Sequence, residues 1–314
     1  MSTESLVIPA AYLMDLLLGD PQISWHPVRL IGRLIAVLEK RLNYPGPKRK
    51  IRGVILLIAT TSAVILTAWG ILGLSALFNR HLFYAVSVVL VYFSISTKSL
   101  AKEANKIGKS LKDGSVSRAR NELSMIVGRD TENLDENGII RATVETVAES
   151  TMDGIVAPLF YAFLGGPLLA WFYKTVNTLD SMVGYKNERF SEFGWASARL
   201  DGLLNFIPAR ITAFLISAAV FLRGRDWRAS VRWAAKFIFK GPGSNSDSPE
   251  AAMAGGLGVQ LGGLNFYSRL PAPKPLLGNT IEPLCTRHVR ESVAISYLAS
   301  FLMLAAGWLA QRAG

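Results

Sequence analysis

Long apolar runs alternate with polar segments along this chain, and several runs have the length of membrane-crossing helices. The clearest run covers residues 51–78, which as a helix is long enough to cross a hydrocarbon core of about 30 Å. A second run, residues 82–97, follows a short turn at residues 79–81, so the two predict a helical hairpin. Residues 201–222 and 292–310 form two more runs. The pattern therefore predicts several membrane-spanning helices.

Two other apolar runs are less regular. Residues 155–176 contain the sequence Gly-Gly-Pro at positions 165–167, which should break or kink a helix because proline lacks the N–H that the helix needs. We favour one kinked span, and a re-entrant pair of half-helices remains open, since broken helices are tolerated where they line protein or water. Residues 6–18 are short for a full crossing. The run at residues 201–222 is also interrupted, by Pro208 and Arg210.

Two polar segments are too long to be turns. Residues 98–153 carry apolar positions at helical spacing, as at Leu123 and Ile126, and this predicts a polar helical insertion on the cytoplasmic side. Residues 223–290 are expected to form a polar loop region. The predicted fold class is an all-α, polytopic integral membrane helical bundle with amphipathic or cytoplasmic helical segments. We expect residues 1–314 to form a single membrane domain.

Composition and charge agree with a membrane protein. Half of the residues are hydrophobic and 18% are charged, whereas soluble domains carry about 25% charged residues. The net charge is +11, but lysine and arginine crowd between the apolar runs, which favours the positive-inside bias and argues against nucleic acid as a partner. We expect a multi-pass protein of the cell membrane with its active site on the cytoplasmic side. The single cysteine excludes an internal disulfide, and no cysteine–histidine cluster has zinc-ligand spacing.

Four charged residues recur at intervals of four before the irregular apolar run. On a helix, one face would carry Arg141, Glu145, Glu149 and Asp153. Mg²⁺ is usually held by one or two carboxylates together with substrate phosphates, so the three acids are candidate metal ligands. From spacing alone, a solvated helix face with Arg–Glu pairs is the stronger interpretation, because exposed pairs of this spacing are common.

The N-terminal apolar run contains an acid and leads into two more polar candidates. Asp15 lies within the run, where an ionisable residue is costly and is a functional hypothesis by default. Asp20 and His26 follow it. The structural alternative is that Asp20 belongs to a turn, that Asp15 is a buried and paired acid, and that His26 is a hydrogen-bonded structural histidine.

Further polar motifs lie in the middle of the chain. Arg129 and Asp130, in the sequence Gly-Arg-Asp-Thr, either bind phosphate or mark the end of one helix and the cap of the next. Polar residues also follow the run at 155–176 and continue into the next run: Asn177, Asp180, Lys186, Glu188, Arg189, Asp201, Asn205 and Arg210. Ionisable residues at membrane depth face a bundle interior or a wet cavity. The sequence contains no Walker A phosphate loop.

Taken in order, these motifs resemble the membrane-bound adenosylcobinamide-phosphate synthase family of cobalamin biosynthesis. The resemblance covers nearly the whole chain and rests on the segments 15–27, 127–131, 145–154, 177–186, 199–210 and 249–255. One segment departs from the family pattern. The family usually has a Ser-Pro-Asn-Ala-Gly type of stretch where this chain has Ser-Asn-Ser-Asp-Ser at positions 244–248, so the role of that loop is left open.

The resemblance implies a carbon–nitrogen ligase. It would join a carboxyl of adenosylcobyric acid to aminopropanol, or to its phosphate, as an amide, with ATP as co-substrate and Mg²⁺ as cofactor. Because this condensation is uphill in water, the carboxyl must be activated, most simply as an acyl phosphate, which needs charge stabilisation and a base. For that chemistry we assign catalytic roles to Asp180, His26 and Glu145. The metal ligands assigned are Glu145, Glu149 and Asp153. Substrate binding is assigned to Arg129, Asp130, Lys186, Arg189, Asp201, Asn205 and Arg210.

The resemblance also implies partners. These are the corrinoid and the amino-alcohol phosphate, membrane lipid, and other enzymes of the cobalamin pathway. Two other functions remain open. A corrinoid-handling membrane transporter would also use broken apolar segments and buried acids. A non-catalytic signalling relative is the third candidate, but the intact acidic motifs argue against it.

The basic segments make the topology testable. Arg49, Lys109 and Arg228 should all face the cytoplasm, because loops rich in lysine and arginine stay inside. In single-cysteine variants of the intact cell, none of the three positions should react with a membrane-impermeant thiol reagent added outside. Labelling of Lys109→Cys from the outer face would contradict this topology.

Overall fold

The computed structural model describes residues 3–21, 23–241, 244–267 and 269–313. Its secondary structure is almost entirely helical, with one two-stranded sheet, which confirms the predicted all-α class. The chain divides into two compact units. Unit 1 consists of residues 1–96, 157–206 and 304–314, and unit 2 consists of residues 97–156 and 207–303.

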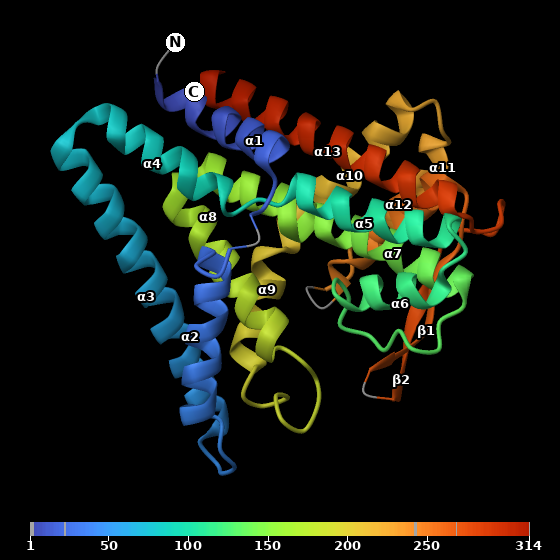
Figure 1. Cartoon of the computed structure of the whole chain (residues 1–314), viewed down its shortest axis with the longest axis horizontal. Helices are drawn as coiled ribbons and strands as arrows, with labels where there is room; N and C mark the ends of the chain where they lie inside the picture. The colour runs from blue at the N-terminus through green and yellow to red at the C-terminus, as the bar shows by residue number, and fades with distance from the viewer. Residues whose placement is uncertain (1–2, 22, 242–243, 268, 314) are drawn as a thin grey trace. The chain divides into compact units, whose positions relative to one another are not determined.

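Unit 1 is built from helices that pack against one another (Figure 1). It contains η1 (Thr3–Leu6), α1 (Val7–Leu18), α2 (Pro27–Leu42), α3 (Arg49–Phe78), α4 (Arg80–Tyr92), α8 (Ala157–Val183) and α9 (Trp195–Leu204). Helix α2 buries Ile31, Ile35 and Glu39 at intervals of four, which places them on one face. The two isoleucines join Leu56 of α3 and Leu179 of α8 in the core.

The predicted break in the run at 155–176 is present in α8. Gly165 has φ −151° and ψ 26°, and Gly166 has φ 65°. A positive φ is accessible to glycine because it has no Cβ, and Pro167 then restarts the helix without needing a backbone donor. The break thus follows from three consecutive residues, and the helix resumes as far as Val183.

Unit 2 combines helices with the hairpin. It contains α5 (Thr97–Lys112), α6 (Val116–Ser124), α7 (Glu136–Thr151), the π-helical turn η2 (Met152–Val156), α10 (Phe206–Leu222), α11 (Trp227–Ile238), α12 (Asp247–Leu257), β1 (Leu261–Tyr267), β2 (Leu270–Leu277) and the first part of α13 (Thr286–Ala313). Figure 1 shows α6 and α7 in green and the hairpin in orange. Helix α7 contacts β1, and α12 contacts α7, α11 and both strands. Helix α7 also contacts α5 and α6, so it packs against three helices and the hairpin.

Residues 223–290 differ from the expected polar loop region. They contain α11, α12 and the antiparallel β1–β2 hairpin. Helix α11 begins where the Asp226 side chain accepts a hydrogen bond from the Ala229 N–H, as an N-cap does. Helix α12 packs tightly on α11, since a Cβ on Gly255 would lie 2.6 Å from the Ala229 carbonyl oxygen. The small residues that allow α12 to pack this closely are also common in loops, which is why the sequence predicted a loop here.

Four helices among the described residues are long and apolar enough to cross a membrane. They are Arg49–Phe78, Arg80–Lys112, Glu136–Val183 and Thr286–Ala313, and the pair α9 and α10 adds a fifth if it is counted as one broken span. The apolar helix Val7–Leu18 is shorter. These findings confirm a multi-pass membrane protein. Within the segment 98–153, helices α5, α6 and α7 form as the spacing predicts; its cytoplasmic location stays a prediction.

Gly53 and Gly70 provide a matched test of packing along α3. A Cβ on Gly53 would lie 1.8 Å from the backbone oxygen of Phe193, whereas a Cβ on Gly70 would meet no atom within 4 Å. Gly53→Ala should therefore destabilise the protein by about 1–3 kcal/mol through overpacking. Gly70→Ala should be neutral or stabilising by up to about 1 kcal/mol, because alanine favours the helix. Thermal unfolding in detergent measures both, and equal effects of the two variants would contradict the close approach.

Candidate functional site

A buried ion pair lies at the centre of the polar residues of unit 2. Arg129, in the loop after α6, places Nη2 2.5 Å from Oε2 of Glu145 on α7. The two side chains are 7% and 1% exposed. The other Glu145 oxygen accepts a hydrogen bond of 2.7 Å from the Gly262 N–H in β1. Burial disfavours the charged guanidinium, but the charge and hydrogen bond of Glu145 raise the pKa of Arg129 above its ordinary value. Arg129 is therefore charged, and both side-chain oxygens of Glu145 have a hydrogen-bond donor.

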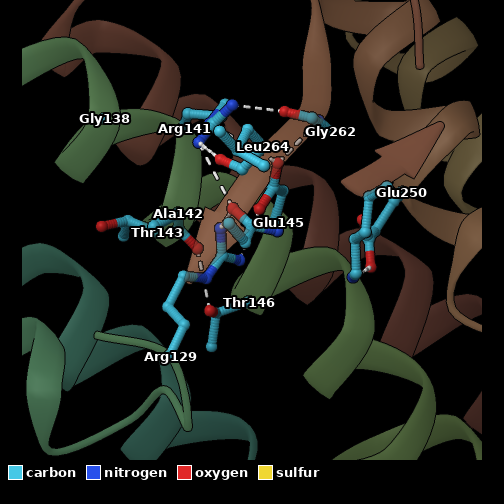
Figure 2. Close-up of polar contacts among 12 residues, drawn as sticks. Arg129, Gly138, Arg141, Ala142, Thr143, Glu145, Thr146, Glu250, Gly262 and Leu264 are labelled. Carbon is cyan, nitrogen blue, oxygen red and sulfur yellow. Dashed lines mark hydrogen bonds and ion pairs between the residues drawn. The ribbon is translucent and has the colours of Figure 1, made fainter. Parts of the chain in front are cut away.

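Strand β1 is held against α7 by arginine. Arg141 donates to the Gly262 carbonyl oxygen and, at 3.2 Å, to that of Leu264. Arg129 and Arg141 both donate to Oδ1 of the buried Asn265, at 2.7 and 3.3 Å. Figure 2 shows Arg141 and Glu145 projecting from one helix towards the strand at Gly262. The predicted i, i+4 spacing thus serves to attach the hairpin to α7.

Glycine makes this attachment possible. The pairing of β1 with β2 is irregular between Leu261 and Gly263, and Gly262 has φ 79°. A Cβ on Gly262 would lie 1.9 Å from the Pro275 carbonyl oxygen. The irregularity turns both backbone groups of Gly262 towards α7, where Glu145 accepts and Arg141 donates.

A second ion pair joins α12 to β2. Glu250 is completely buried, and its Oε1 lies 3.3 Å from Nζ of Lys274. Burial raises the pKa of the Glu250 carboxyl to about 8; Lys274 opposes this shift, and the charges of Glu149 and Glu145 add to it. The pKa of Lys274 is raised as well, because Glu250 and the two other glutamates outweigh its burial. Burial also raises the pKa of Asp247, at the start of α12.

We call these residues of unit 2 the polar cluster: Arg129, Arg141, Glu145, Glu149, Asp247, Glu250, Asn265 and Lys274. Four of its groups are not fully satisfied within the part of the chain that the structure describes. The side chain of Glu149 is half-buried and has no hydrogen bond or ion pair there. Nε of Arg141, Oε2 of Glu250 and Nδ2 of Asn265 are buried without a hydrogen-bond partner. Buried polar atoms are usually paired, so these four groups are candidates for contact with a bound molecule.

Metal binding by this cluster needs a ligand from outside the chain. Among the residues described, no three histidine, cysteine, aspartate or glutamate side chains are placed to hold a metal ion. Glu145 is occupied by Arg129 and Gly262. Glu149 fits one carboxylate position of an Mg²⁺ site, because this ion is usually held by one or two carboxylates and substrate phosphates. The assignment of Glu145, Glu149 and Asp153 as a metal set stays a prediction.

Asp130 and Arg210, two of the predicted substrate-binding residues, lie in unit 2 and contact backbone. Oδ2 of Asp130 accepts a hydrogen bond of 2.6 Å from the Arg269 N–H at the hairpin turn. Arg210 donates to the carbonyl oxygens of Ile238 and Lys240 and to Oδ1 of Asn245. These bonds fix the ends of the hairpin and of α11. Asp153, a predicted metal ligand, lies in the π-helical turn η2, a type of turn that is frequent at functional sites.

The remaining predicted residues lie in unit 1 and form separate groups. Nε2 of His26 lies 2.6 Å from Oδ1 of Asp20, and the His26 ring packs edge-on against Phe93. Asp15 is completely buried on α1. The structure thus brings His26 together with Asp20.

A second group of unit 1 joins α8 to α9. Asp201 accepts hydrogen bonds from the amides of Asn177, at 3.3 Å, and Asn205, at 3.0 Å. The Tyr173 hydroxyl donates to Oδ1 of Asn205 at 2.9 Å. Asp180 lies one turn beyond Asn177 on α8. Asn205, Asp201 and Asn177 therefore form one network, which their order in the sequence indicated only in part.

Arg189 and Lys186 differ in their surroundings. Arg189 pairs with Glu39 of α2, with an N–O distance of 3.0 Å. Burial opposes ionisation of Glu39, but hydrogen bonds from Arg189 and Asn43 and the charge of Arg189 lower its pKa. Lys186 is exposed in the segment between α8 and α9. Of the two predicted phosphate-binding cations in this segment, one is thus committed to an ion pair.

Three residues of the polar cluster were not predicted from the sequence: Lys274, Asn265 and Asp247. Lys274 lies between prolines in the sequence Pro-Lys-Pro, where a lone cation in an otherwise uncharged stretch was the available signal. Asn265 and Lys274 gain their significance from strand pairing, because Gly263 of β1 is opposite Lys274 in β2. Glu250 belongs to a motif that carried the resemblance, but no role was assigned to it.

The raised pKa of Glu250 predicts a pH-dependent stability. The pKa of this carboxyl is 4.5 when exposed and about 8 in the folded protein, so the folded state binds the proton more tightly. This difference contributes fully to the free energy of unfolding below pH 4.5, and the contribution is lost as the pH rises to about 8. The melting temperature of the wild type should therefore fall between pH 5 and pH 8, and Glu250→Gln should reduce that fall. Glu132→Gln, at an exposed acid, is the control. An unchanged slope in Glu250→Gln would contradict the raised pKa.

Comparison with known proteins identifies the family of this chain. The CobD/Cbib protein family matches residues 8–296. The chain is 43% identical to the cobalamin biosynthesis protein CobD of Geobacter metallireducens, over 97% of this chain and 96% of that protein. It is 42% identical to CobD of Listeria monocytogenes (97% and 98% covered) and 40% identical to the cobalamin biosynthesis protein CbiB of Salmonella choleraesuis (97% and 96%). No solved structure matches the chain. The match over nearly the full length shows that this chain belongs to the CobD/CbiB family of cobalamin biosynthesis proteins, as its motifs suggested.

Proposed function

We propose that the chain is an adenosylcobinamide-phosphate synthase, a carbon–nitrogen ligase of the cell membrane that faces the cytoplasm. It would join a carboxyl of adenosylcobyric acid to aminopropanol or its phosphate, with ATP and Mg²⁺. The observation that supports this proposal best is the polar cluster of unit 2. Four acids gathered without positive charge would repel one another, but here three cations lie among them, Arg129, Arg141 and Lys274.

The cluster offers the groups that an acid–amine ligation needs. Activation of the carboxyl by phosphoryl transfer concentrates negative charge, which positively charged groups and a metal stabilise. Lys274 is 26% exposed and Arg141 21% exposed, so both remain accessible to a substrate phosphate while they are held in place. Glu149 supplies the carboxylate for Mg²⁺. In this proposal Arg129 and Glu145 position strand β1 rather than contact the metal.

Amide formation also needs a base, because the amine is protonated at neutral pH and must lose its proton to attack. The raised pKa of Glu250, about 8, is close to the value that suits a general base at neutral pH. Its buried Oε2 has no hydrogen-bond partner in the described chain. Within unit 2, Glu250 is therefore the general base that we propose. His26 and Asp180 of unit 1 stay as the bases proposed from the sequence, and the amine site stays assigned to Asp180 and Lys186.

The reaction can be tested directly. Purified protein in lipid vesicles should convert adenosylcobyric acid and aminopropanol phosphate into the amide when ATP and Mg²⁺ are added, as measured by mass spectrometry of the corrinoid. Release of ADP and phosphate in equal amounts would support an acyl phosphate. Corrinoid binding or transport across the vesicle without amide formation would contradict the ligase proposal and favour the transporter.

Glu149→Gln tests the carboxylate proposed to hold the metal. The variant keeps the size of the side chain and should fold normally, because Glu149 makes no hydrogen bond or ion pair within the described residues. Its turnover should fall at least about 100-fold, the scale of losing one group that stabilises transition-state charge, with partial recovery at high Mg²⁺.

The matched control is Glu136→Gln, at an exposed acid in the first turn of the same helix. It should keep nearly wild-type turnover. Wild-type turnover in Glu149→Gln, in protein that melts like the wild type, would rule out the metal role.

A further inference from the structure

A group of arginines lies outside the polar cluster, where the end of α10 meets the start of α13 in unit 2. Arg223 follows α10 directly, and Arg287, Arg290 and Glu291 belong to the first turns of α13. These four residues line a pocket of about 320 Å³. No residue of the polar cluster lines it, so the pocket is a separate feature of the unit.

The acids near this pocket are already neutralised. Glu291 pairs with Arg225 and, at 3.6 Å, with Arg287. Glu282 pairs with the same two arginines, at 3.4 Å from Arg225. Two glutamates thus balance two arginines, and these pairs hold Arg287 at the pocket wall.

Arg223 and Arg290 provide the remaining charge. Both are exposed, and neither has an ion pair with the described residues. The pocket therefore keeps a net charge of about +2 after pairing, and like charges so close together are unfavourable unless an anion joins them. The planar guanidinium group binds phosphate oxygens through two parallel hydrogen bonds.

We propose that this arginine pocket, formed by Arg223, Arg287 and Arg290, binds a phosphate group. Two sources share this chemistry. The pocket lies at the ends of two helices counted among the candidate spans, a depth at which anionic phospholipid headgroups are found. A soluble phosphate is the other source. The inference does not depend on the proposed ligase activity, because none of its residues takes part in that proposal.

The competing explanation is that these arginines serve only the positive-inside bias, which needs charge but no pocket. A matched pair of variants separates the two. Arg223→Gln with Arg290→Gln removes two charges from the pocket. Arg228→Gln with Arg232→Gln removes two exposed charges from α11 and leaves the pocket intact.

The test uses the full-length protein in detergent micelles. Its melting temperature is measured while phosphatidylglycerol, phosphatidylcholine or inorganic phosphate is added. The wild type should be stabilised by phosphatidylglycerol more than by phosphatidylcholine if the source is a lipid headgroup, and by inorganic phosphate if it is soluble. The pocket variant should need at least about tenfold more of the stabilising ligand, the loss expected for charge-assisted hydrogen bonds. The α11 variant should respond like the wild type.

Two results would overturn the proposal. One is that neither phosphatidylglycerol, relative to phosphatidylcholine, nor inorganic phosphate stabilises the wild type. The other is that the pocket and α11 variants lose stabilisation equally, which would show a dependence on charge alone. Each single variant, Arg223→Gln and Arg290→Gln, is measured as well, so that the comparison holds even if the double variant does not fold.

Discussion

Taking a guanidinium and a carboxylate out of water costs several kcal/mol for each ion, and Arg129 and Glu145 meet that cost together. Their side chains are almost completely buried, and the remaining oxygen of Glu145 is satisfied by the backbone of Gly262. The pair joins the loop after α6, helix α7 and strand β1. The arrangement of the polar cluster depends on this connection, because the hairpin that carries Asn265 and Lys274 is attached to α7 through Glu145 and Arg141.

The hairpin explains how a helical protein gathers so many charges in one place. Helix α7 presents Arg141, Glu145 and Glu149 one turn apart, and α12 adds Asp247 and Glu250. Helices alone would leave an excess of acids, since α7 and α12 contribute four acids to the cluster and one arginine. Strand β2 brings Lys274 to Glu250, and Arg129 comes from the preceding loop. Stabilisation of the acids and access for a substrate phosphate then rest on the same cations.

The sequence predicted the local elements of the structure better than its tertiary contacts. The spans over 51–78 and 292–310, the break at Gly165–Pro167 and the helices within 98–153 all follow from local patterns of hydropathy and backbone chemistry. Helix α12 and the hairpin did not, because a glycine-rich helix and a proline-rich strand owe their structure to tertiary packing. The spacing of Arg141, Glu145 and Glu149 predicted that the three residues share one face of a helix, α7. It could not show that Glu145 faces Arg129, since that contact joins residues 16 positions apart through the course of a loop.

The stability of variants at Arg129 and Glu145 tests the account most directly. A double-mutant cycle with Arg129→Met, Glu145→Gln and the combined variant, followed by thermal or denaturant unfolding in detergent, measures how strongly the two residues depend on each other. Each single variant should lose about 3–5 kcal/mol, because it leaves one buried charge or polar group without its partner. The combined variant should lose clearly less than the two losses added together, with a coupling of at least about 1 kcal/mol. Additive losses would show that the two residues act independently, and the buried ion pair would then not be the basis of the polar cluster.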